Sequence, residues 1–358
     1  MNVKTKNYRW IIVALLFLAT TINYIDRQII GLLKPILEVE FQWSESDFAR
    51  IVVAFTAAYA VGLLLFGRLI DRVGTKIGYA ISVIIWSIMG MLHAAATSVT
   101  GFSLARIGLG LGEAGNFPAA MKTVAEWFPK KERGLAAGIF NSGTSIGVVV
   151  ALLITPWILV NYGWQQVFVI TGALGFVWLL LWLWLYEIPA KQKYLSREEF
   201  LLITEQQEVA QDSQLKNVPG PPSQGERPTK WIRLFTFPQT WAFIFGKFLI
   251  DPIFWFFLFW LPSYFSSTFH LDLTRPSLEL MIIYSATTVG SIGGGYSSSL
   301  LIKGGMASLK ARKTVLLIVA FLELSIILAQ YVTNVWAAVT LISLAVAAHQ
   351  AWAANIFT

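Results

Sequence analysis

The chain has 358 residues, of which 56% are hydrophobic and only 13% are charged. A soluble globular protein carries about 25% charged residues, so the composition excludes a soluble enzyme and indicates an integral membrane protein. The chain contains no cysteine, which excludes disulfides, and its three histidines lie far apart without the spacing of metal ligands. We therefore expect neither a metal nor another bound cofactor.

Apolar stretches of the length that a helix needs to cross a bilayer, about 20 residues, recur along the chain. Six stretches come first and four follow a polar gap; they cover residues 10–30, 48–66, 77–96, 101–124, 135–156, 167–186, 241–265, 280–302, 315–331 and 335–357. The first stretch is long and lacks a small-residue cleavage site, so we expect it to stay in place as the first crossing.

The net charge of +7 follows a pattern of membrane topology. If the N-terminus is cytoplasmic and the stretches alternate in direction, most of the 27 basic residues fall on the inner side. The outer segments hold only Lys34, Arg50 and Arg275. This bias is the positive-inside rule, so the basic balance predicts orientation and argues against a nucleic-acid partner.

The polar gap between the sixth and seventh stretches is rich in Lys, Glu, Gln and Pro, and it includes Pro219-Gly220-Pro221-Pro222. We interpret it as a cytoplasmic linker, in which Ser196 and Glu199 form a capping box that opens a short surface helix. The predicted organisation is an N-terminal six-helix bundle over residues 1–187, a linker over 188–234 and a C-terminal bundle over 235–358. Because the last bundle has four stretches, we expect it to be incomplete, lacking two helices.

A polar loop joins the second and third stretches and contains Gly67, Asp71, Arg72, Gly74 and Lys76. The glycines permit a tight turn. Asp71 can interact with a helix N-terminus or with a neighbouring arginine, which would hold the cytoplasmic side in one state. This ordered spacing strongly resembles the signature loop of the major facilitator superfamily. Two six-helix bundles joined by a long inner loop are also the layout of that superfamily.

The first stretch carries the run Asn23-Tyr24-Ile25-Asp26-Arg27. Ionised groups at membrane depth cost several kcal/mol unless they are paired or hydrated, so they are functional candidates. The alternative is that Asp26 and Arg27 lie at the outer interface and reach water. Adjacent helical residues point about 100° apart, so we expect each of the two to have its own partner or ligand.

The fourth stretch places Arg106 and Glu113 seven residues apart, on one face of a helix. Gly108 and Gly112 form a pair of small residues that allows close helix contact. One buried cation and one buried acid beside a close contact favour a function, and a structural ion pair is the alternative.

Three sequence runs together resemble the anion:cation symporter family, and more narrowly its bacterial hexuronate and sugar-acid branch. They are Asn23-Tyr-Ile-Asp-Arg27, Gly112-Glu-Ala-Gly-Asn-Phe-Pro118, and Glu126-Trp-Phe-Pro-Lys-Lys-Glu-Arg133 leading to Asn141-Ser-Gly143. The resemblance extends through all ten stretches, and the combined runs are more specific than any one alone.

The resemblance implies proton-coupled uptake of an organic anion by alternating access, the anion being a hexuronate such as galacturonate or glucuronate. By this analogy Arg27 and Arg106 bind the substrate carboxylate, Asn23, Tyr24 and Tyr59 are further substrate ligands, and Asp26 and Glu113 are the protonatable pair. An arginine fork matches a carboxylate with two hydrogen bonds and keeps its charge, which agrees with that assignment.

Further candidates lie in later stretches. Lys247 and Asp251 stand at i and i+4 before Pro252, which we expect to loosen the helix; they form either an ion pair or a substrate contact from the second bundle. Additional candidate ligands are polar side chains of the fifth and tenth stretches: Asn141, Ser142, Gln350 and Asn355. Glu323 is an acid for which the sequence suggests no role.

Several alternatives remain. The substrate could be another sugar acid, such as galactonate or glucarate, another carboxylate, or a phosphorylated sugar taken up by exchange, and the protein could be an anion sensor. No nucleophile–base or metal arrangement favours an enzyme. We expect a monomer in the bacterial inner membrane, with a cytoplasmic N-terminus and with an organic anion and protons as its partners. We expect the chain as written to transport poorly, because its second bundle is incomplete.

Overall fold

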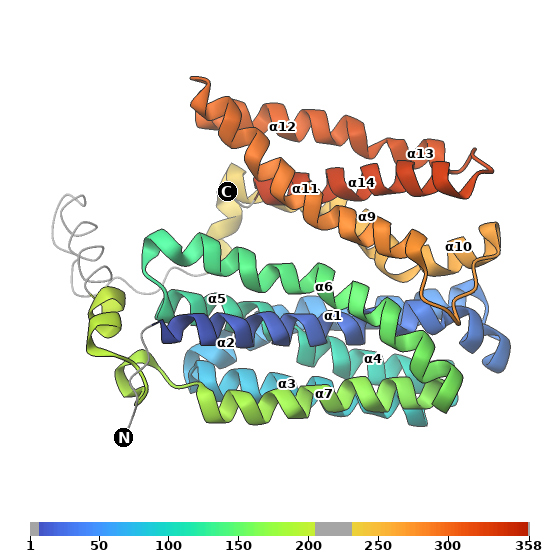
Figure 1. The fold of residues 1–358 in the computed structure, drawn as a ribbon, viewed down its shortest axis with the longest axis horizontal. Coiled ribbons are helices and arrows are strands. Elements are labelled where there is room, and N and C mark those ends of the chain that lie inside the picture. The colour runs from blue at the N-terminus through green and yellow to red at the C-terminus, as the bar shows by residue number, and fades with distance from the viewer. Residues whose placement is uncertain (1–6, 205–230, 357–358) are drawn as a thin grey trace. The chain divides into compact units, whose positions relative to one another are not determined.

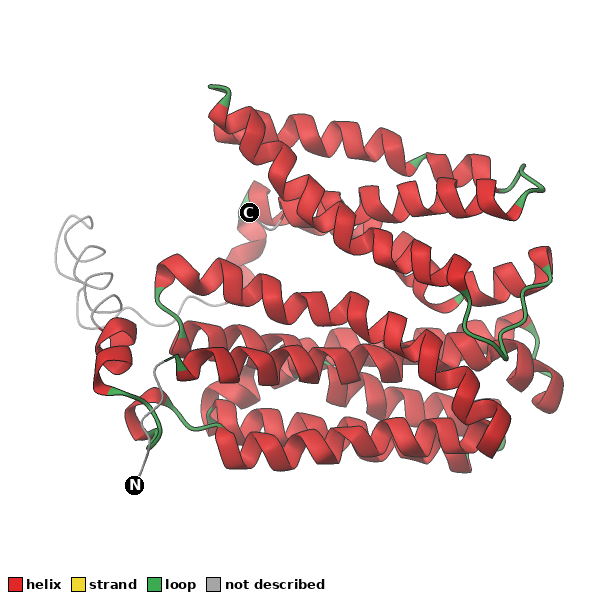
Figure 2. Ribbon diagram, in the orientation of Figure 1, coloured by secondary structure: helices red, strands yellow, loops and turns green. Residues whose placement is uncertain are grey.

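The computed structural model describes residues 7–204 and 231–356. Within these ranges all regular secondary-structure elements are helices, which confirms the predicted all-α class (Figure 2). The chain divides into two compact units, Met1–Pro219 and Gly220–Thr358. Residues 205–230 lie outside the described residues, and with them the Pro-rich part of the predicted linker.

The described part of the first unit contains seven long helices, which run alongside one another (Figure 1). They are α1 (Tyr8–Phe41), α2 (Glu45–Val73), α3 (Thr75–Leu92), α4 (Val99–Glu113), α5 (Asn116–Trp127), α6 (Lys130–Tyr162) and α7 (Trp164–Leu185). Short 3-10 turns follow α3 and α7, at His93–Ala95 and Pro189–Lys191, and a helix over residues 197–204 ends the described part. The main packing partners are α1 with α6, α2 with α4, and α3 with both α4 and α7.

The second unit begins with a 3-10 turn at Trp231–Thr236. Its helices are α9 (Pro238–Phe259), α10 (Leu261–Phe269), α11 (Leu278–Lys303), α12 (Ser308–Glu323), α13 (Ser325–Ala329) and α14 (Val335–Ile356). The helix α14 packs along α11 and α12 and also touches α9 and α13. It is therefore the central helix of the described part of this unit.

Several helices begin at a serine that caps the free N–H groups of their first turn. Ser44 accepts from the N–H of Asp47, and the Asp47 carboxylate accepts from the N–H of Ser44, so α2 opens with a complete capping box. Ser98 and Ser277 cap α4 and α11 in the same way, with one hydrogen bond each. These local signals explain where the helices start.

All ten apolar stretches are helical, but three of them break into two helices. The fourth stretch divides between α4 and α5 at Ala114 and Gly115, just before Pro118, which lacks an N–H group and fits the first turn of a new helix. The seventh divides at Trp260, two residues before Pro262, and the ninth divides at Leu324. By contrast, α9 continues through Pro252, so the predicted loosening there does not end the helix.

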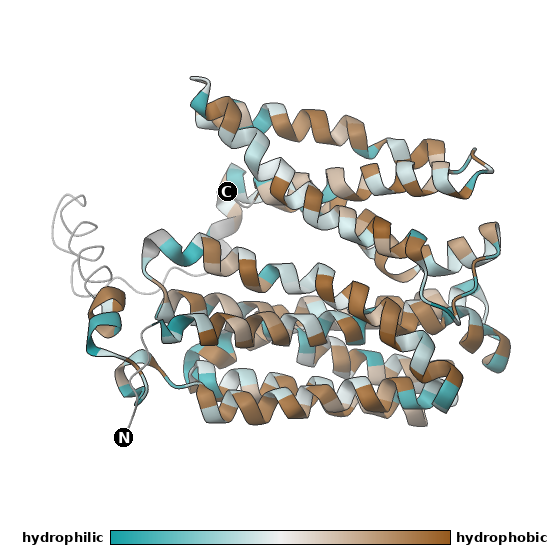
Figure 3. Ribbon diagram, in the orientation of Figure 1, coloured by the Kyte–Doolittle hydropathy of each residue, from teal (hydrophilic) through white to brown (hydrophobic). Residues whose placement is uncertain are grey.

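Seven of the described helical segments are long and apolar enough to cross a membrane by themselves. They comprise α1, α2, α6 from Glu132, α7, α9, α14 and the segment Thr75–Ala95. Hydrophobic residues dominate the helices, whereas polar residues gather at helix ends and in loops (Figure 3). The other halves of the broken stretches are shorter, and α4 in addition carries Arg106 and Glu113, so α4, α5, α10, α12 and α13 fall outside that group.

Candidate functional site

Four of the buried ionisable side chains in the first unit form a charge cluster between α1 and α4. Asp26 and Arg27 come from α1, and Arg106 and Glu113 come from α4; each is exposed by 3% or less. Their positions exclude the alternative in which Asp26 and Arg27 reach water at the outer interface. Charges at membrane depth are costly, so this charge cluster is the leading candidate for a functional site.

Arg27 and Glu113 form an ion pair between α1 and α4. The Nε and Nη2 atoms of Arg27 donate to Oε2 of Glu113 at 2.9 and 2.8 Å, and Nη2 also donates to the Asn23 amide oxygen at 3.2 Å. The partners are 86 residues apart in sequence. We expected Arg27 to have a partner of its own, and this partner is Glu113. The sequence had placed Glu113 on the same helix face as Arg106.

Aromatic rings flank the guanidinium groups of the cluster. The Arg27 guanidinium lies 4.7 Å from the ring centres of both Tyr24 and Tyr59. Phe55 lies between the two arginines, with its ring centre 5.4 Å from each guanidinium. Such cation–π contacts stabilise a desolvated cation without neutralising it. They bring the predicted ligands Tyr24 and Tyr59 into the cluster through their ring faces.

Asp26 and Arg106 have buried polar atoms without a hydrogen-bond partner among the described residues. These atoms are both carboxylate oxygens of Asp26 and all three guanidinium nitrogens of Arg106. The hydroxyl of Thr171 lies near Asp26, but it donates to the Val167 carbonyl at 2.9 Å. Asp26 and Arg106 attract each other electrostatically without a direct hydrogen bond. Buried polar groups normally find partners, so this arrangement indicates groups that a ligand or a proton can satisfy.

Glycines allow α4 to lie close enough to its neighbours to bury this cluster. A Cβ atom at Gly112 would be 2.5 Å from the backbone nitrogen of Trp86 in α3, and one at Gly108 would be 2.4 Å from the Met89 sulfur. These contacts confirm the close helix approach predicted from Gly108 and Gly112. Gly110, which the sequence analysis did not single out, would place a Cβ 2.5 Å from the Phe55 carbonyl of α2.

The signature loop lies at one end of the first unit. Gly74 has a positive φ of 83°, which only glycine adopts easily, and it ends α2 and starts α3. Asp71 pairs with Lys122 of α5 at 2.8 Å, so its partner is a lysine and not the helix N-terminus or arginine that we expected. Lys76 pairs with Glu187 at 3.0 Å, and Arg72 is exposed.

The prediction for Gly67 was wrong in one respect. This residue lies inside α2 with open space around it and without a positive φ, so it takes no part in the tight turn. The turn falls at Gly74, seven residues later, because that is where the backbone leaves the helical region.

The sequence analysis missed a second polar network, at the start of α1. The Glu199 carboxylate accepts from the backbone N–H groups of Tyr8 and Arg9 at 2.8 and 3.1 Å and from the Arg9 guanidinium at 2.8 Å. Arg9 also pairs with Glu132 of α6 at 2.9 Å. Ser196 caps its helix as predicted, by accepting from the Glu199 N–H, but the Glu199 side chain caps α1 and does not complete the expected capping box.

The remaining candidates come from α6 and from the second unit. In α6, Gly143 and Gly147 pack on the backbone of α1, whereas Asn141 is exposed and Ser142 donates to the Ile139 carbonyl at 2.7 Å. In the second unit, Lys247 and Asp251 form the ion pair that was one of the two alternatives, with N–O 2.6 Å.

Two polar residues of α14 complete the set. Asn355 donates to the Gly294 and Ala351 carbonyls at 3.0 and 2.9 Å, and Gln350 is half-buried. The roles of Asn141, Ser142, Lys247, Gln350 and Asn355 as substrate ligands stay predictions.

Comparison with known proteins places the chain in a family. The model of the Major Facilitator Superfamily matches residues 16–358. The chain is 32% identical over 357 residues to the hexuronate transporter of Escherichia coli K12, covering 99% of this chain and 80% of that protein. It is 32% identical over 300 residues to the galacturonate transporter of Dickeya chrysanthemi, covering 84% of each.

A solved structure has the same fold. The crystal structure of a bacterial homologue of the human lysosomal transporter Spinster, inward-facing and unoccupied, matches with a TM-score of 0.73 at 21% identity, over 99% of this chain and 75% of that one. The chain therefore belongs to the major facilitator superfamily, which makes it a multi-pass membrane protein of a transporter class. The predicted fold and the predicted resemblance to bacterial hexuronate transporters are confirmed.

Proposed function

We propose that the protein takes up a sugar-acid anion together with protons, by alternating access, across the bacterial inner membrane with its N-terminus inside. The proposed substrate is a hexuronate such as galacturonate or glucuronate. Relatives named as hexuronate and galacturonate transporters support the substrate class. The observation that carries the proposal is the buried charge cluster, in which an arginine and a carboxylate lack hydrogen-bond partners among the described residues.

Arg106 is the first proposed ligand of the substrate. Its guanidinium is buried, carries five N–H donors in a planar fork and has no competing hydrogen bond among the described residues. A carboxylate accepts two parallel hydrogen bonds from such a fork. The sugar carboxylate would thus supply the partner that Arg106 lacks.

Charge balance explains why protons would accompany the anion. Two arginines and two ionised carboxylates sum to zero, and a substrate anion would add an uncompensated negative charge at membrane depth. One proton on Glu113 or Asp26 restores neutrality. A proton on Glu113 also weakens its hold on Arg27, which then becomes available to the substrate. Proton and anion binding would therefore favour each other.

A sugar acid with two carboxylates, such as glucarate, is the second candidate. The guanidinium groups of Arg27 and Arg106 both lie 5.4 Å from the Phe55 ring centre, so one cluster contains two of them, and a proton on Glu113 would weaken the ion pair that holds Arg27. Each could hold one carboxylate of such a substrate. Competition between unlabelled glucarate and labelled galacturonate separates the two candidates.

The test is uptake of radiolabelled galacturonate by the full-length protein in proteoliposomes, with the outside acidic or with no pH gradient. We expect accumulation only with the gradient. Arg106→Lys should abolish it, because a lysine keeps the charge but loses the fork, whereas the exposed control Arg50→Lys should transport normally. Glu113→Gln should exchange substrate without gradient-driven accumulation. Binding without uptake would indicate a sensor and contradict the proposal.

A further inference from the structure

Within its described residues, the second unit contains one buried acid–base pair, which is not part of the charge cluster and has no assigned role. Glu323 is the last residue of α12, and His349 lies in the middle of α14, 26 residues later. The Nδ1 atom of His349 is 3.1 Å from Oε1 of Glu323, and the two residues are exposed by 3% and 5%. The sequence suggested no role for Glu323, and the structure supplies a partner.

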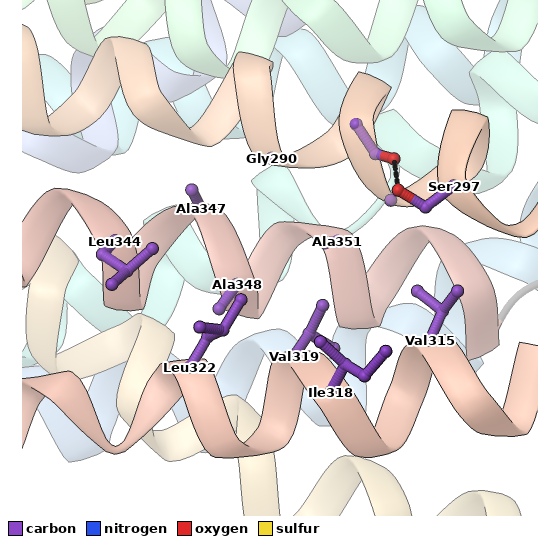
Figure 4. A pocket seen from close by; sticks show the side chains of 12 residues that line it. Gly290, Ser297, Val315, Ile318, Val319, Leu322, Leu344, Ala347, Ala348 and Ala351 are labelled. Atoms are coloured by element: carbon purple, nitrogen blue, oxygen red, sulfur yellow. Dashed lines mark hydrogen bonds between the residues drawn. The ribbon is translucent and has the colours of Figure 1, made fainter.

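The surroundings of this pair are apolar. Phe254 of α9 stacks on the His349 ring, with 5.5 Å between ring centres and an interplanar angle of 12°. Leu322 and Ala348, the chain neighbours of the two residues, line a cavity of about 250 Å³ between α11, α12 and α14 (Figure 4). The lining of this pocket is almost entirely apolar. Because Glu323 and His349 are themselves buried, charge on the pair is poorly screened by water.

Ionisable groups on the helices that pack around the pair lie elsewhere. Those of α9 are Lys247 and Asp251, which pair with each other, and those of α11 include Glu279 and Lys303 at its two ends and Tyr284, which donates to the Phe257 carbonyl. The cations of α12 lie in its first two turns, at Lys310, Arg312 and Lys313. Ten residues of helix separate Lys313 from Glu323, about 15 Å. Glu323 and His349 are thus each other's ionic partner within the described residues.

We propose that Glu323 and His349 together form a second proton-binding site, which carries one proton of the transport cycle. An ionised glutamate beside a neutral histidine leaves one negative charge in an apolar interior, whereas one added proton makes the pair neutral. That proton resides either on the ring, giving an imidazolium–carboxylate pair, or on the carboxyl, which then donates to the neutral ring. Membrane depth favours the neutral state while the pair is buried, and water reaching the pair would allow the proton to leave.

The transport role of this site rests on the proposed proton-coupled uptake, but proton binding can be tested without transport. The chain has only three histidines, His93, His270 and His349, so their ring nitrogens can be resolved by ¹⁵N NMR of the protein in lipid nanodiscs. At neutral pH we expect either a doubly protonated His349 ring or a protonated Glu323 carboxyl in infrared difference spectra against Glu323→Gln. His270→Gln is the control, because His270 lies in a loop outside the pair. A neutral ring beside an ionised carboxylate overturns the proposal.

The second arm measures how many protons accompany each substrate, from the pH gradient that balances a known substrate gradient in proteoliposomes. Glu323→Gln should lower the ratio by one, and the double variant with His349→Gln should lower it by no more than one, because the two residues share one proton. An unchanged ratio with intact uptake overturns the transport role. If the wild type shows no gradient-driven uptake at all, the proposed function fails, while the spectra still decide whether the pair holds a proton.

Discussion

The interiors of the two units differ in how they treat charge. Besides the paired Arg9, Lys34 and Glu199, the first unit buries the two arginines and two carboxylates of the charge cluster, whose polar atoms are only partly satisfied within the described residues. Within its described residues, the second unit buries one acid–base pair beside an apolar pocket. Close helix packing at glycines is nevertheless common to both units. Glycines of α4 lie against α2 and α3, and Gly290 and Gly294 of α11 lie against α14. The comparison teaches that close glycine packing makes the fold, whereas unsatisfied buried charge marks the site.

The largest expected effect concerns the two arginines of the first unit. Arg27→Met and Arg106→Met should both abolish binding of galacturonate, which isothermal titration calorimetry in detergent measures. Their effects on stability should differ. Arg27→Met leaves Glu113 buried without its cation and should cost about 3 kcal/mol of unfolding free energy, whereas Arg106→Met breaks no hydrogen bond within the described residues.

Thermal unfolding of the two variants provides the comparison. A much lower Tm for Arg27→Met than for Arg106→Met is the expected result. Equal losses of Tm would contradict the view that Arg27 is structurally paired while Arg106 is held ready for a ligand.

Close packing is the next feature to break. Gly112→Leu should prevent correct folding, because a Cβ would already be 2.5 Å from the Trp86 backbone nitrogen. Gly294→Leu in the second unit should be as harmful, since its Cβ would be 2.5 Å from the Ala351 Cα atom. Gly293 has open space around it, so Gly293→Leu is the matched control. Size-exclusion profiles of the three variants measure the outcome, and a well-folded Gly112→Leu would refute the need for close glycine packing.

A smaller effect is expected for the cap on α1. Glu199→Gln replaces the carboxylate that accepts hydrogen bonds from the Tyr8 and Arg9 N–H groups and from the Arg9 guanidinium. The free energy of unfolding should therefore fall by about 1–3 kcal/mol. The exposed neighbour provides the control, Glu198→Gln, with little expected change. Denaturation in a detergent series gives both values. If the two variants unfold together, Glu199 does not anchor the helix over residues 197–204 to α1.

The smallest expected effect depends on pH. Burial opposes ionisation of Glu187, but the hydrogen bonds from Lys76 and the Ile188 N–H, together with the charges of Lys76 and Lys191, outweigh it and lower the pKa of Glu187 below its ordinary value. The stabilisation is therefore fully present above the ordinary glutamate pKa of about 4.3 and is lost as the pH falls through the lowered pKa. Because the pair is about one third exposed, it contributes under about 1 kcal/mol.

A comparison of wild type and Lys76→Met across this pH range checks the direction. The stability difference between them should shrink toward acid. A difference that stays constant between pH 3 and pH 7 would show that the Lys76–Glu187 contact does not matter for stability.

The sequence alone determined the helices and selected the charged residues that lie buried in the charge cluster. Apolar length identifies a membrane helix without knowledge of its neighbours, because each crossing must satisfy its backbone hydrogen bonds internally. For the same reason Asp26, Arg27, Arg106 and Glu113 could be selected from the sequence, since charge inside an apolar stretch is costly wherever the stretch packs. The glycine pattern of α4 predicted close contact, although not which helices it contacts.

Only the tertiary structure decided which charged groups are partners. Arg27 pairs with Glu113, 86 residues away in sequence, and Arg9 pairs with Glu199, 190 residues away. Glu323 pairs with His349, which lies on another helix 26 residues later. Helical periodicity relates residues within one helix, so it could place Arg106 and Glu113 on one face but could not say that Glu113 turns to α1. Pairing between helices depends on their packing, and packing is a property of the assembled bundle.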